Sequence, residues 1–322
     1  MKDICAQNMP LLTIFTPAYN RADTIGRTYE SLCRQTCKDF EWLIIDDGSK
    51  DGTRKLVQSW LIDESLELIG ESGFAGFSKD APWLRIRYEW KENGGLHTGY
   101  NKAIELMDTE LCICIDSDDY MADNTVERIY ARWEECKDNP EVAGIIGLDY
   151  YDGKMTPIGG KFSREEVNVH VMDLGRVLHH YGDMKIVCRV ELMKKYWPMQ
   201  VFEGEKNFNP FYYYLQIDND HTYYVVNENF CIVDYQEGGM TANILNQFYN
   251  SPRSFACYRE AILRQKRLPL AYRLRNAMHF GSSILFTGEY GRLFQAPAAW
   301  MKVVMFPLAI LLNLYIRIKR KK

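Results

Sequence analysis

The stretch LCICIDSDD at residues 111–119 decides the fold of the first half of the chain. Five apolar residues are followed directly by an acidic cluster, and an uninterrupted apolar run of this length is typical of a buried strand in a parallel sheet. Side chains two positions apart on an extended backbone point to the same side, so Asp116 and Asp118 can converge on one ligand. Converging carboxylates repel each other unless a cation neutralises them, and Mg²⁺ or Mn²⁺ favours such oxygen ligands.

Strand and helix patterns alternate around this stretch. Apolar runs predict strands at 11–16, 41–45, 85–90 and 111–115, and each is followed by a helical pattern, apart from an irregular insertion expected at 63–82. Such repeats predict a mostly parallel sheet covered by helices on both sides. A second acidic cluster, DDGS at 46–49, follows the strand at 41–45. Since ligands of such sheets bind at the carboxyl ends of the strands, both clusters are candidates for one site.

The second half of the chain predicts an α+β arrangement that builds the other wall of a cleft. Strands are expected at 143–150, 185–190, 222–226 and 230–234, the last two joined as a hairpin through NEN at 227–229. We expect one domain over 1–245, divided into halves at 10–135 and 136–245. A helical extension is expected at 246–322.

Composition excludes some classes of protein. The 39 basic and 43 acidic residues give a net charge of −4, which does not suggest a nucleic-acid partner. The nine cysteines include no CxxC pair, so reduced thiols in a cytoplasmic protein are expected. Residues 1–10 lack the apolar core of a secretion signal. The six histidines show no HExxH spacing that would favour a zinc site.

Five ordered segments together resemble family 2 glycosyltransferases. They are TPAYN at 16–20, LCRQT at 32–36, EWLIIDDGSKDGT at 41–53, NGGLHTGYNKAI at 93–104 and DSDD at 116–119, and the resemblance covers about residues 10–135. It implies an α/β fold of the GT-A type, with a nucleotide-binding sheet flanked by helices. It also implies inverting transfer of a sugar from a nucleotide diphospho-sugar, with UDP as the expected nucleotide. By this resemblance, the half at 10–135 would bind the nucleotide sugar and the half at 136–245 would bind the acceptor.

The resemblance also implies roles for individual residues in donor binding. Asp47 would contact the nucleobase, Asp116 would lie near the ribose or sugar, and Asp118 would bind the Mg²⁺ or Mn²⁺ ion. The residues that would line the nucleotide pocket or contact the nucleotide are Thr16, Tyr19, Lys91 and Asn93. Asn101 would support the start of a helix beside the diphosphate.

The base that deprotonates the acceptor is expected in the second half of the chain. The segment FEGEKNF at 202–208 looks like a Gly-Glu-Lys variant of the Glu-Asp pair found in other members. Glu205 is the first candidate and Glu203 the second, and Asp218 and Asp220 are less favoured. A solvated acidic turn paired with Lys206 is the alternative interpretation. The segment YQEGGMT at 235–241 resembles a further family segment near the acceptor cleft.

The end of the chain suggests contact with a membrane. Residues 303–316 are apolar and are followed by five basic residues among 317–322. The apolar stretch is shorter than the roughly 20 residues that cross a membrane, so insertion into the membrane–water interface is expected. The alternatives are a helix buried against the catalytic domain and a helix that binds a partner protein. The expected location is the cytoplasmic face of the cell membrane. A glycan or lipid-linked acceptor in surface polysaccharide synthesis would fit that location.

Two other functions are compatible with an acidic nucleotide-binding sheet. One is a sugar nucleotidyltransferase, although residues 16–21 lack the glycine-rich loop that such enzymes carry. The other is a non-catalytic, membrane-tethered module that binds nucleotide sugars. A glycoside hydrolase also uses two carboxylates, but it would not explain the nucleotide-binding pattern of the first half.

Overall fold

The computed structural model describes residues 10–234 and 244–320. The acceptor segment expected at 235–241 lies outside these residues. The chain divides into two compact units. The first contains the described residues of 1–93, 99–197 and 220–234, and the second contains 94–98, 198–219 and 244–320.

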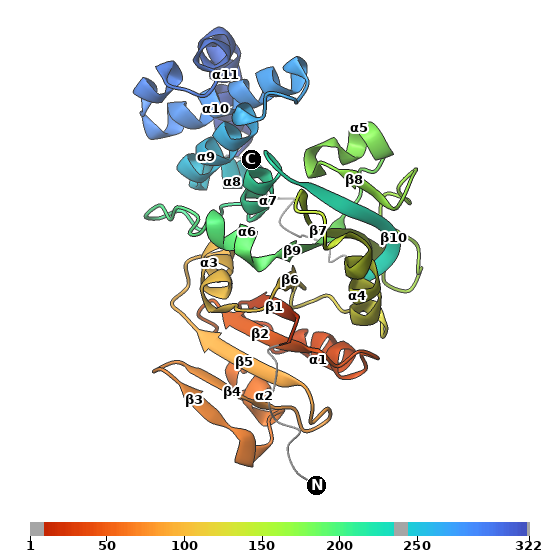
Figure 1. Cartoon of the computed structure of the whole chain (residues 1–322). Helices are drawn as coiled ribbons and strands as arrows, with labels where there is room; N and C mark the ends of the chain where they lie inside the picture. Colours follow the sequence, from red (N-terminus) through yellow and green to blue (C-terminus); the bar gives the residue numbers. More distant parts are fainter. Residues whose placement is uncertain (1–9, 235–243, 321–322) are drawn as a thin grey trace. The chain divides into compact units, whose positions relative to one another are not determined.

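The first unit is built on one ten-stranded sheet (Figure 1). Its centre has four parallel strands in the order β5-β2-β1-β6, which confirms the four strands predicted in the first half. These strands are β1 (Leu12–Ala18), β2 (Phe40–Asp46), β5 (Arg85–Trp90) and β6 (Leu111–Cys114). The helices among them are α1 (Ile25–Cys33), α2 (Thr53–Ser59), α3 (Leu96–Leu106) and α4 (Thr125–Cys136).

Apolar side chains of the central strands fix the helices on the sheet. Every residue of β1, β2 and β6 is buried. α1 places Tyr29 in a stack with Trp60, with ring centroids 4.2 Å apart, and α4 buries Trp133 in the same core. Burial of such large aromatic side chains contributes strongly to stability, so the strand ends rest on a rigid core.

The rest of the sheet differs from the prediction in three ways. Residues 63–82 are not irregular, because β3 (Glu67–Ile69) and β4 (Gly73–Phe77) extend the sheet beyond β5 as antiparallel strands. The predicted hairpin at 227–229 is wrong, since β10 (Thr222–Val233) runs through it and absorbs the polar residues in register shifts against β7 (Val142–Tyr151). The sheet is mixed, because β9 (Met184–Arg189) is antiparallel to both β6 and β7.

Short elements complete the first unit. They are η1 (Asp63–Ser65), β8 (Val167–Val169), η2 (Val171–Asp173), α5 (Leu174–Leu178) and α6 (Val190–Lys195). β8 forms the edge of the sheet and is antiparallel to β10.

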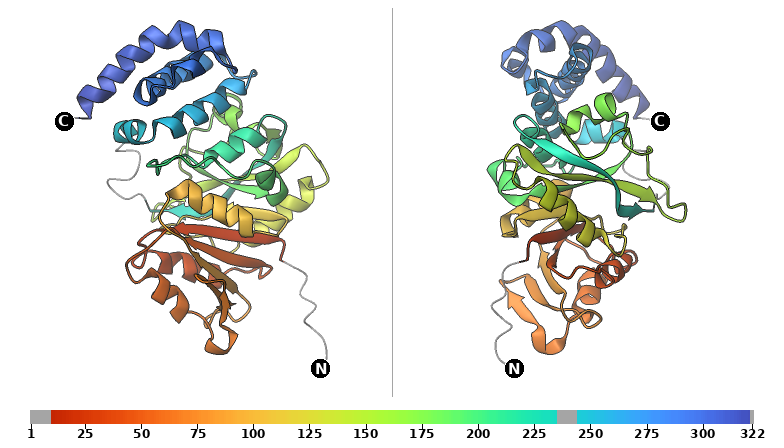
Figure 2. Two further views of the ribbon diagram at one scale, coloured as in Figure 1. Left: turned by 90° about the vertical axis from the view of Figure 1, so that its left-hand side faces the viewer. Right: turned by 45° about the vertical axis from the view of Figure 1, so that its right-hand side comes forward.

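The second unit is helical in its described part. Its helices are α7 (Phe211–Ile217), α8 (Ile244–Asn250), α9 (Pro252–Arg264), α10 (Leu270–Thr287), η4 (Tyr290–Phe294) and α11 (Ala299–Lys319). α10 packs against both α9 and α11, and the three helices can be followed in Figure 2. Residues 198–219, which precede the predicted boundary near residue 245, belong to this unit. The predicted domain boundaries stay a prediction.

The last helix has two different faces. Its inner face is polar in places: Lys302 is fully buried, and its ammonium group lies 2.9 Å from Glu260, while Asn313 donates a hydrogen bond to Ser282 O at 3.0 Å. Gly281 lets α10 approach closely, since a Cβ there would lie 2.7 Å from that of Ala309. The outer face leaves large apolar side chains exposed. They are Trp300, Val303, Val304, Leu308, Ile310, Leu311, Leu314, Tyr315 and Ile318.

Candidate active site

Four parallel strands end at one edge of the first unit's sheet, and a predicted site residue follows or ends each of them. Main-chain hydrogen bonds hold these ends together beyond the strands. Asp47 N donates to Ala18 O at 2.8 Å, Lys91 N donates to Asp46 O at 2.9 Å, and Ile115 N donates to Phe15 O at 3.0 Å. The side chains that follow β1, β2, β5 and β6 therefore share one edge, as expected for the ligand-binding edge of a parallel sheet.

Asp47, Lys91 and Asn93 form a polar cluster at this edge. The Lys91 ammonium group contacts the Asp47 carboxylate, which is buried. The Asn93 amide donates to Asp47 O at 2.8 Å and to Asp47 Oδ2 at 3.1 Å. The structure thus brings together three residues that the sequence assigned to the nucleotide, and it fixes the direction of the Asp47 carboxylate through charge-assisted contacts.

Gly48 is required by the geometry of this cluster. Its φ of +85° lies in the left-handed region that favours glycine. A Cβ at this position would lie 2.8 Å from Asn93 N, so a side chain would displace the segment that carries Asn93. The glycine of the DDGS turn therefore allows Asn93 to approach Asp47.

The neighbouring carboxylate of Asp46 has a structural role. It is fully buried, accepts a hydrogen bond from the Tyr88 hydroxyl, and accepts another from Ser49 N at 2.7 Å. Asp46 therefore ties β2 to β5 and closes the DDGS turn. Of the two adjacent aspartates, Asp47 is the one whose cluster includes the predicted nucleotide contacts.

Thr16 and Tyr19 lie at the end of β1 but differ in exposure. The Thr16 hydroxyl is fully buried and accepts a hydrogen bond from Trp42 Nε1 at 2.9 Å, so its side chain is engaged inside the protein. Tyr19 is largely exposed, as a residue that stacks on a ligand would be. The nucleotide-lining roles of both residues stay predictions.

Asp116 and Asp118 follow β6, as the sequence predicts. Asp116 is about half exposed, and Lys185 Nζ on β9 lies 3.1 Å from its carboxylate and 3.2 Å from that of the buried Asp119. The Asp118 carboxylate has no ion pair or hydrogen bond with any residue that the structure describes. Within the acidic cluster, Asp118 is therefore the carboxylate available for a ligand.

Buried charges surround Lys185. Burial raises the pKa of Asp119 to about 6, while Lys185 lowers it and the neighbouring aspartates raise it. Burial likewise raises the pKa of Asp149 on β7 to about 7, against the opposing effect of Lys185. Burial alone would lower the pKa of Lys185, but Asp116 and the other nearby acidic groups hold it well above its usual value.

Two arginines hold the acidic turn from the side of α1. Arg21 Nε donates to Ser117 Oγ at 3.1 Å, and Arg27 Nη2 donates to Asp118 O at 2.7 Å. These residues, together with Lys185 and Asp119, were not predicted as part of the site. Their partners lie more than 60 residues away in sequence, so no local pattern indicates them.

The acidic turn fits a cation that takes its remaining ligands from a substrate. No group of three or more histidine, cysteine or acidic side chains suited to a metal occurs within residues 10–234 and 244–320. However, Mg²⁺ is commonly held by one or two carboxylates together with substrate phosphates. The free carboxylate of Asp118 and the half-exposed one of Asp116 meet that requirement.

Glu205, the predicted base, caps a helix in the second unit. Its Oε1 accepts a hydrogen bond from Arg253 N at 2.9 Å, and its Oε2 accepts from Ser254 N at 2.8 Å and Ser254 Oγ at 2.7 Å. The carboxylate thus satisfies the free N–H groups of the first turn of α9. This arrangement gives a buried glutamate a structural purpose, and the catalytic role stays a prediction.

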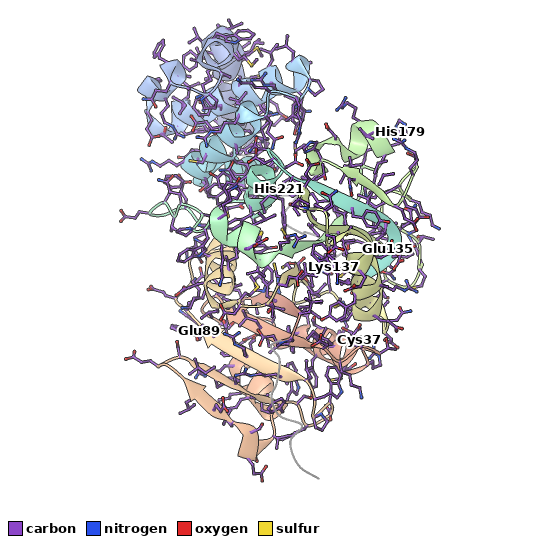
Figure 3. All side chains as sticks on the ribbon, viewed as in Figure 1. Cys37, Glu89, Glu135, Lys137, His179 and His221 are labelled. Carbon is purple, nitrogen blue, oxygen red and sulfur yellow. The ribbon has the colours of Figure 1, made fainter. Side chains whose placement is uncertain are left out.

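The other candidates have different environments. Glu203 is exposed, whereas Asp218 is fully buried and paired with Arg267. Asp220 is exposed. Asn101 lies inside α3 rather than at its start, and its carbonyl accepts a hydrogen bond from Trp197 Nε1 at 2.7 Å. His179 and His221 lie apart on the molecule (Figure 3), in keeping with the lack of a histidine pattern in the sequence.

One protein-family model matches the part of the chain that forms this edge of the sheet. The model described as "Glycosyl transferase family 2" matches residues 13–157, which include β2, β5, β6, all but the first residue of β1, and every donor-site residue predicted from the sequence. Residues 13–157 belong to glycosyl transferase family 2. The resemblance inferred from the five sequence segments is thereby confirmed.

Two named relatives share the family 2 region with this chain. The chondroitin synthase of Pasteurella multocida (strain Pm70) is 31% identical over 127 residues, which are 39% of this chain and 11% of that protein. The putative teichuronic acid biosynthesis glycosyltransferase TuaG of Bacillus subtilis (strain 168) is 31% identical over 120 residues, 37% of this chain and 40% of the relative. This chain therefore spans less than half the length of either relative.

Solved structures share the fold over most of the chain. TarS 1–349 of S. aureus in complex with UDP-GlcNAc gives a TM-score of 0.57 at 18% identity, covering 92% of this chain and 79% of TarS 1–349. The mannosyltransferase PcManGT of Pyrobaculum calidifontis, in complex with GDP-Man and Mn²⁺, gives 0.53 at 16% identity, covering 96% and 88%. The family 2 domain has the predicted GT-A fold, a mixed α/β sheet with flanking helices.

Proposed function

We propose that the protein is an inverting, cation-dependent glycosyltransferase that moves a sugar from a UDP-sugar to an acceptor hydroxyl. The family 2 match supports sugar transfer, and relatives named for chondroitin and teichuronic acid synthesis support a role in surface polysaccharides. The complex of TarS with UDP-GlcNAc supports UDP as the nucleotide. A glycan or a lipid-linked glycan would be the acceptor.

One observation carries this proposal. The shared end of β5, β2, β1 and β6 places Lys91, Asp47, Tyr19 and the Asp116–Asp118 turn at the same edge of the sheet. Asp47, oriented by Lys91 and Asn93, would accept hydrogen bonds from the nucleotide base. Asp116 and Asp118, which follow β6, would lie beside the diphosphate of the bound donor. This order of base-binding and phosphate-binding groups along one sheet edge suits a nucleoside diphosphate that lies across the strand ends.

The chemistry follows from the charges at this edge. Asp116 and Asp118 would hold the Mg²⁺ or Mn²⁺ ion, which would supply positive charge to the diphosphate as it leaves. The acceptor oxygen forms a bond to the anomeric carbon while the bond from that carbon to the diphosphate oxygen breaks. The acceptor proton passes to a carboxylate base. Attack from the side opposite the leaving group inverts the configuration.

The base is assigned to Glu205 with Glu203 as the alternative. Both carboxylate oxygens of Glu205 already accept hydrogen bonds from the first turn of α9. Glu205 would therefore reach an acceptor hydroxyl only if α9 moved away from it. The exposed Glu203 needs no such movement. Variants at both positions separate the two assignments.

We further propose that the protein associates with the cytoplasmic face of the cell membrane through α11. Among the described residues, this helix alone is long and apolar enough to cross a bilayer. Its inner face is held on the second unit by Lys302 and Asn313, whereas its outer face is apolar and its last turns carry Arg317, Lys319 and Arg320. A helix with one attached polar face and one apolar face suits insertion into the interface rather than a span.

A donor screen tests the proposed reaction. The purified full chain is incubated with Mn²⁺ and UDP-, GDP- or dTDP-sugars, with and without membrane extract as the source of acceptor, and released nucleoside diphosphate is measured. UDP release that requires the extract and Mn²⁺ is the expected result. Release of pyrophosphate from UTP and a sugar phosphate would instead identify a nucleotidyltransferase. Binding of UDP-sugar without any turnover would identify a non-catalytic binding module.

A further inference from the structure

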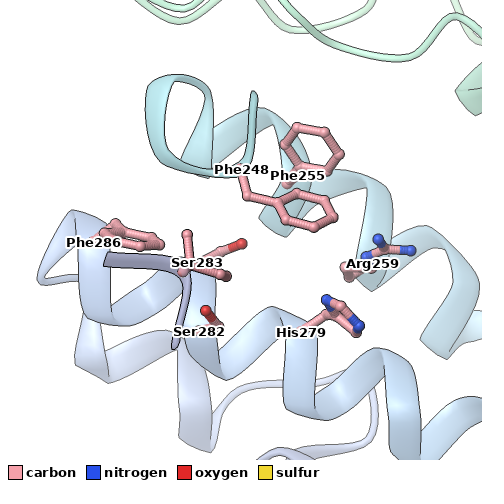
Figure 4. Close-up of a pocket in the computed structure, with 8 residues that line it drawn as sticks. Phe248, Phe255, Arg259, His279, Ser282, Ser283 and Phe286 are labelled. Atoms are coloured by element: carbon pink, nitrogen blue, oxygen red, sulfur yellow. The ribbon is translucent and has the colours of Figure 1, made fainter. Parts of the chain in front are cut away.

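The second unit contains a polar cavity that the donor site does not use. A cavity of about 270 Å³ lies between the loop before α7 and the helices α8 and α9. Its polar lining comes from Asn207, Asn209, Ser254, Tyr258 and Arg259, and Phe248 and Phe255 supply apolar walls. A smaller pocket between α8, α9, α10 and α11 shares Phe248, Phe255 and Arg259 with it (Figure 4). The Arg259 side chain therefore borders both spaces.

Arg259 carries a charge that the described residues leave uncompensated. Its guanidinium donates to Asn276 Oδ1 at 2.9 Å and lies over the Tyr258 ring at 5.6 Å, but no acidic side chain of the described chain pairs with it. Its Nε atom is buried without a hydrogen-bond partner. Because a partly buried cation with a buried, unbonded N–H group and no counter-charge is unfavourable, this arrangement is best explained by an anion that binds there.

Other cationic side chains in the same unit have the acidic partner that Arg259 lacks among the described residues. Arg292 lies 2.8 Å from Glu260, Lys302 lies 2.9 Å from the same carboxylate, and Arg253 lies 2.7 Å from Glu289. Each of these charges has an acidic partner within the protein. Arg259 belongs to the same unit, but it borders the cavity and has no such carboxylate among the described residues.

Two further groups in the smaller pocket support an anionic ligand. Ser282 is buried, and its hydroxyl has no hydrogen-bond partner, so it has a donor to offer. Burial lowers the pKa of His279 to about 4, and Arg259 and Arg275 lower it further. The imidazole is therefore neutral at pH 7 and leaves Arg259 as the charge beside it. Figure 4 shows His279 near Arg259 and Ser282 further along α10.

We propose that this cavity binds a phosphate group, with Arg259 as its counter-charge and the amides of Asn207 and Asn209 as further donors. Arginine suits phosphate because its planar N–H groups match two phosphate oxygens. The phosphate comes either from a membrane lipid headgroup or from a free phosphate compound. The aromatic walls formed by Phe248 and Phe255 accommodate the apolar part of a lipid ligand.

The test compares full-length wild-type protein with Arg259→Gln and with Arg264→Gln, a matched change at an exposed arginine of the same helix. Inorganic pyrophosphate is titrated in the presence of EDTA and saturating UDP, and the rise in melting temperature is measured. Separately, the proteins are sedimented with phosphatidylcholine vesicles that contain phosphatidic acid, or phosphatidylglycerol as an anionic control. The affinity of each protein for UDP is also measured without pyrophosphate. A chain that does not bind UDP would contradict the proposed donor site, independently of the result for the cavity beside Arg259.

Wild type and Arg264→Gln should be stabilised by pyrophosphate, whereas Arg259→Gln should bind it about tenfold more weakly or not at all. Without ligand, Arg259→Gln should melt at the same temperature as wild type or higher, because an uncompensated buried charge is removed. A preference for phosphatidic acid that Arg259→Gln abolishes assigns the phosphate to a lipid, and loss of pyrophosphate binding alone assigns it to a free compound. Equal responses in wild type and Arg259→Gln to both probes, or a lower melting temperature of Arg259→Gln without ligand, would overturn the proposal. Should Arg259→Gln fail to fold, Arg259→Lys, which keeps the charge but not the planar group, provides the same comparison.

Discussion

The Ser254 hydroxyl and main-chain N–H both donate hydrogen bonds to Glu205 Oε2, at 2.7 and 2.8 Å. This contact joins two segments 49 residues apart and places the predicted base on the first turn of α9. It gives Glu205 a stabilising role in the second unit whether or not it also takes a proton. Any loss of activity on changing Glu205 must therefore be judged against a loss of stability.

Glu205→Gln should lower the free energy of unfolding by about 1–3 kcal/mol, because one of the accepting oxygens is replaced by an amide that faces N–H donors. Glu203→Gln should change it by less than about 0.5 kcal/mol, since Glu203 is exposed. Urea unfolding measures both. Ser254→Ala is the matched control, because it weakens the same cap but leaves the carboxylate in place. If Glu205→Gln lost turnover while Ser254→Ala kept it at equal stability, Glu205 would act as the base.

Asp118→Asn should reduce Mn²⁺-stimulated release of UDP by about a hundredfold, since the variant removes a charge expected to hold the cation. Its melting temperature should stay close to that of wild type, because the Asp118 carboxylate has no ion pair or hydrogen bond within the described chain. Asp123→Asn, at an exposed aspartate paired with Arg34 on the surface, is the control. Turnover that depends on Mn²⁺ as in wild type would rule out Asp118 as a metal ligand.

The buried Asp149 should make stability depend on pH. Its folded pKa of about 7 exceeds the usual value of 3.8, so its contribution to stability is complete below about pH 4 and is lost as the pH rises through 7. Asp149→Asn should therefore be more stable than wild type at pH 8, by roughly 2–4 kcal/mol, and nearly equal to it at pH 4. Urea unfolding at both pH values measures the difference. Asp138→Asn, at an exposed aspartate, should show no such difference.

Charges on the outer face of α11 should weaken membrane binding. Leu311 and Ile318 each expose 63% of their surface, so Leu311→Glu together with Ile318→Glu should reduce binding to anionic vesicles about tenfold or more, with little effect on stability. Co-sedimentation with phosphatidylglycerol vesicles measures the change. Leu68→Glu on β3, where the side chain is also exposed, controls for added charge. Equal binding by the α11 variant and wild type would contradict interfacial docking.

The central sheet and its acidic edge could be predicted because their signals are local. Apolar runs such as 111–115 and the acidic residues directly after them place Asp47, Asp116 and Asp118 without knowledge of the rest of the fold. The hairpin of β3 and β4 was missed because Gly70, Gly73 and Gly76 interrupt the alternation that would indicate strands. The sequence predicts two strands in place of β10 because NEN at 227–229 resembles a turn. In the sheet, these three residues are accommodated by shifts in register between β10 and β7.

Residues that act across the fold could not be found in the same way. Lys185 reaches Asp116 because β9 is inserted antiparallel between β6 and β7, and nothing near residue 185 indicates that neighbour. The cap that Glu205 provides depends on a helix that begins 47 residues later, at Pro252. The fully buried Lys302 lies in a segment whose composition predicts an apolar helix, and only Glu260 on α9 explains its position. The environments of Lys185, Glu205 and Lys302 therefore depend on tertiary contacts that no local sequence pattern indicates.

The two-faced character of α11 also affects how the purified chain would behave in water. Since Lys302 and Asn313 keep the inner face bound to the protein, the helix cannot turn its outer apolar side chains inward when lipid is removed. An apolar surface that stays in water tends to find a second copy of itself. Concentration-dependent self-association that a mild detergent reverses would therefore reflect vacated lipid contacts rather than a native oligomer.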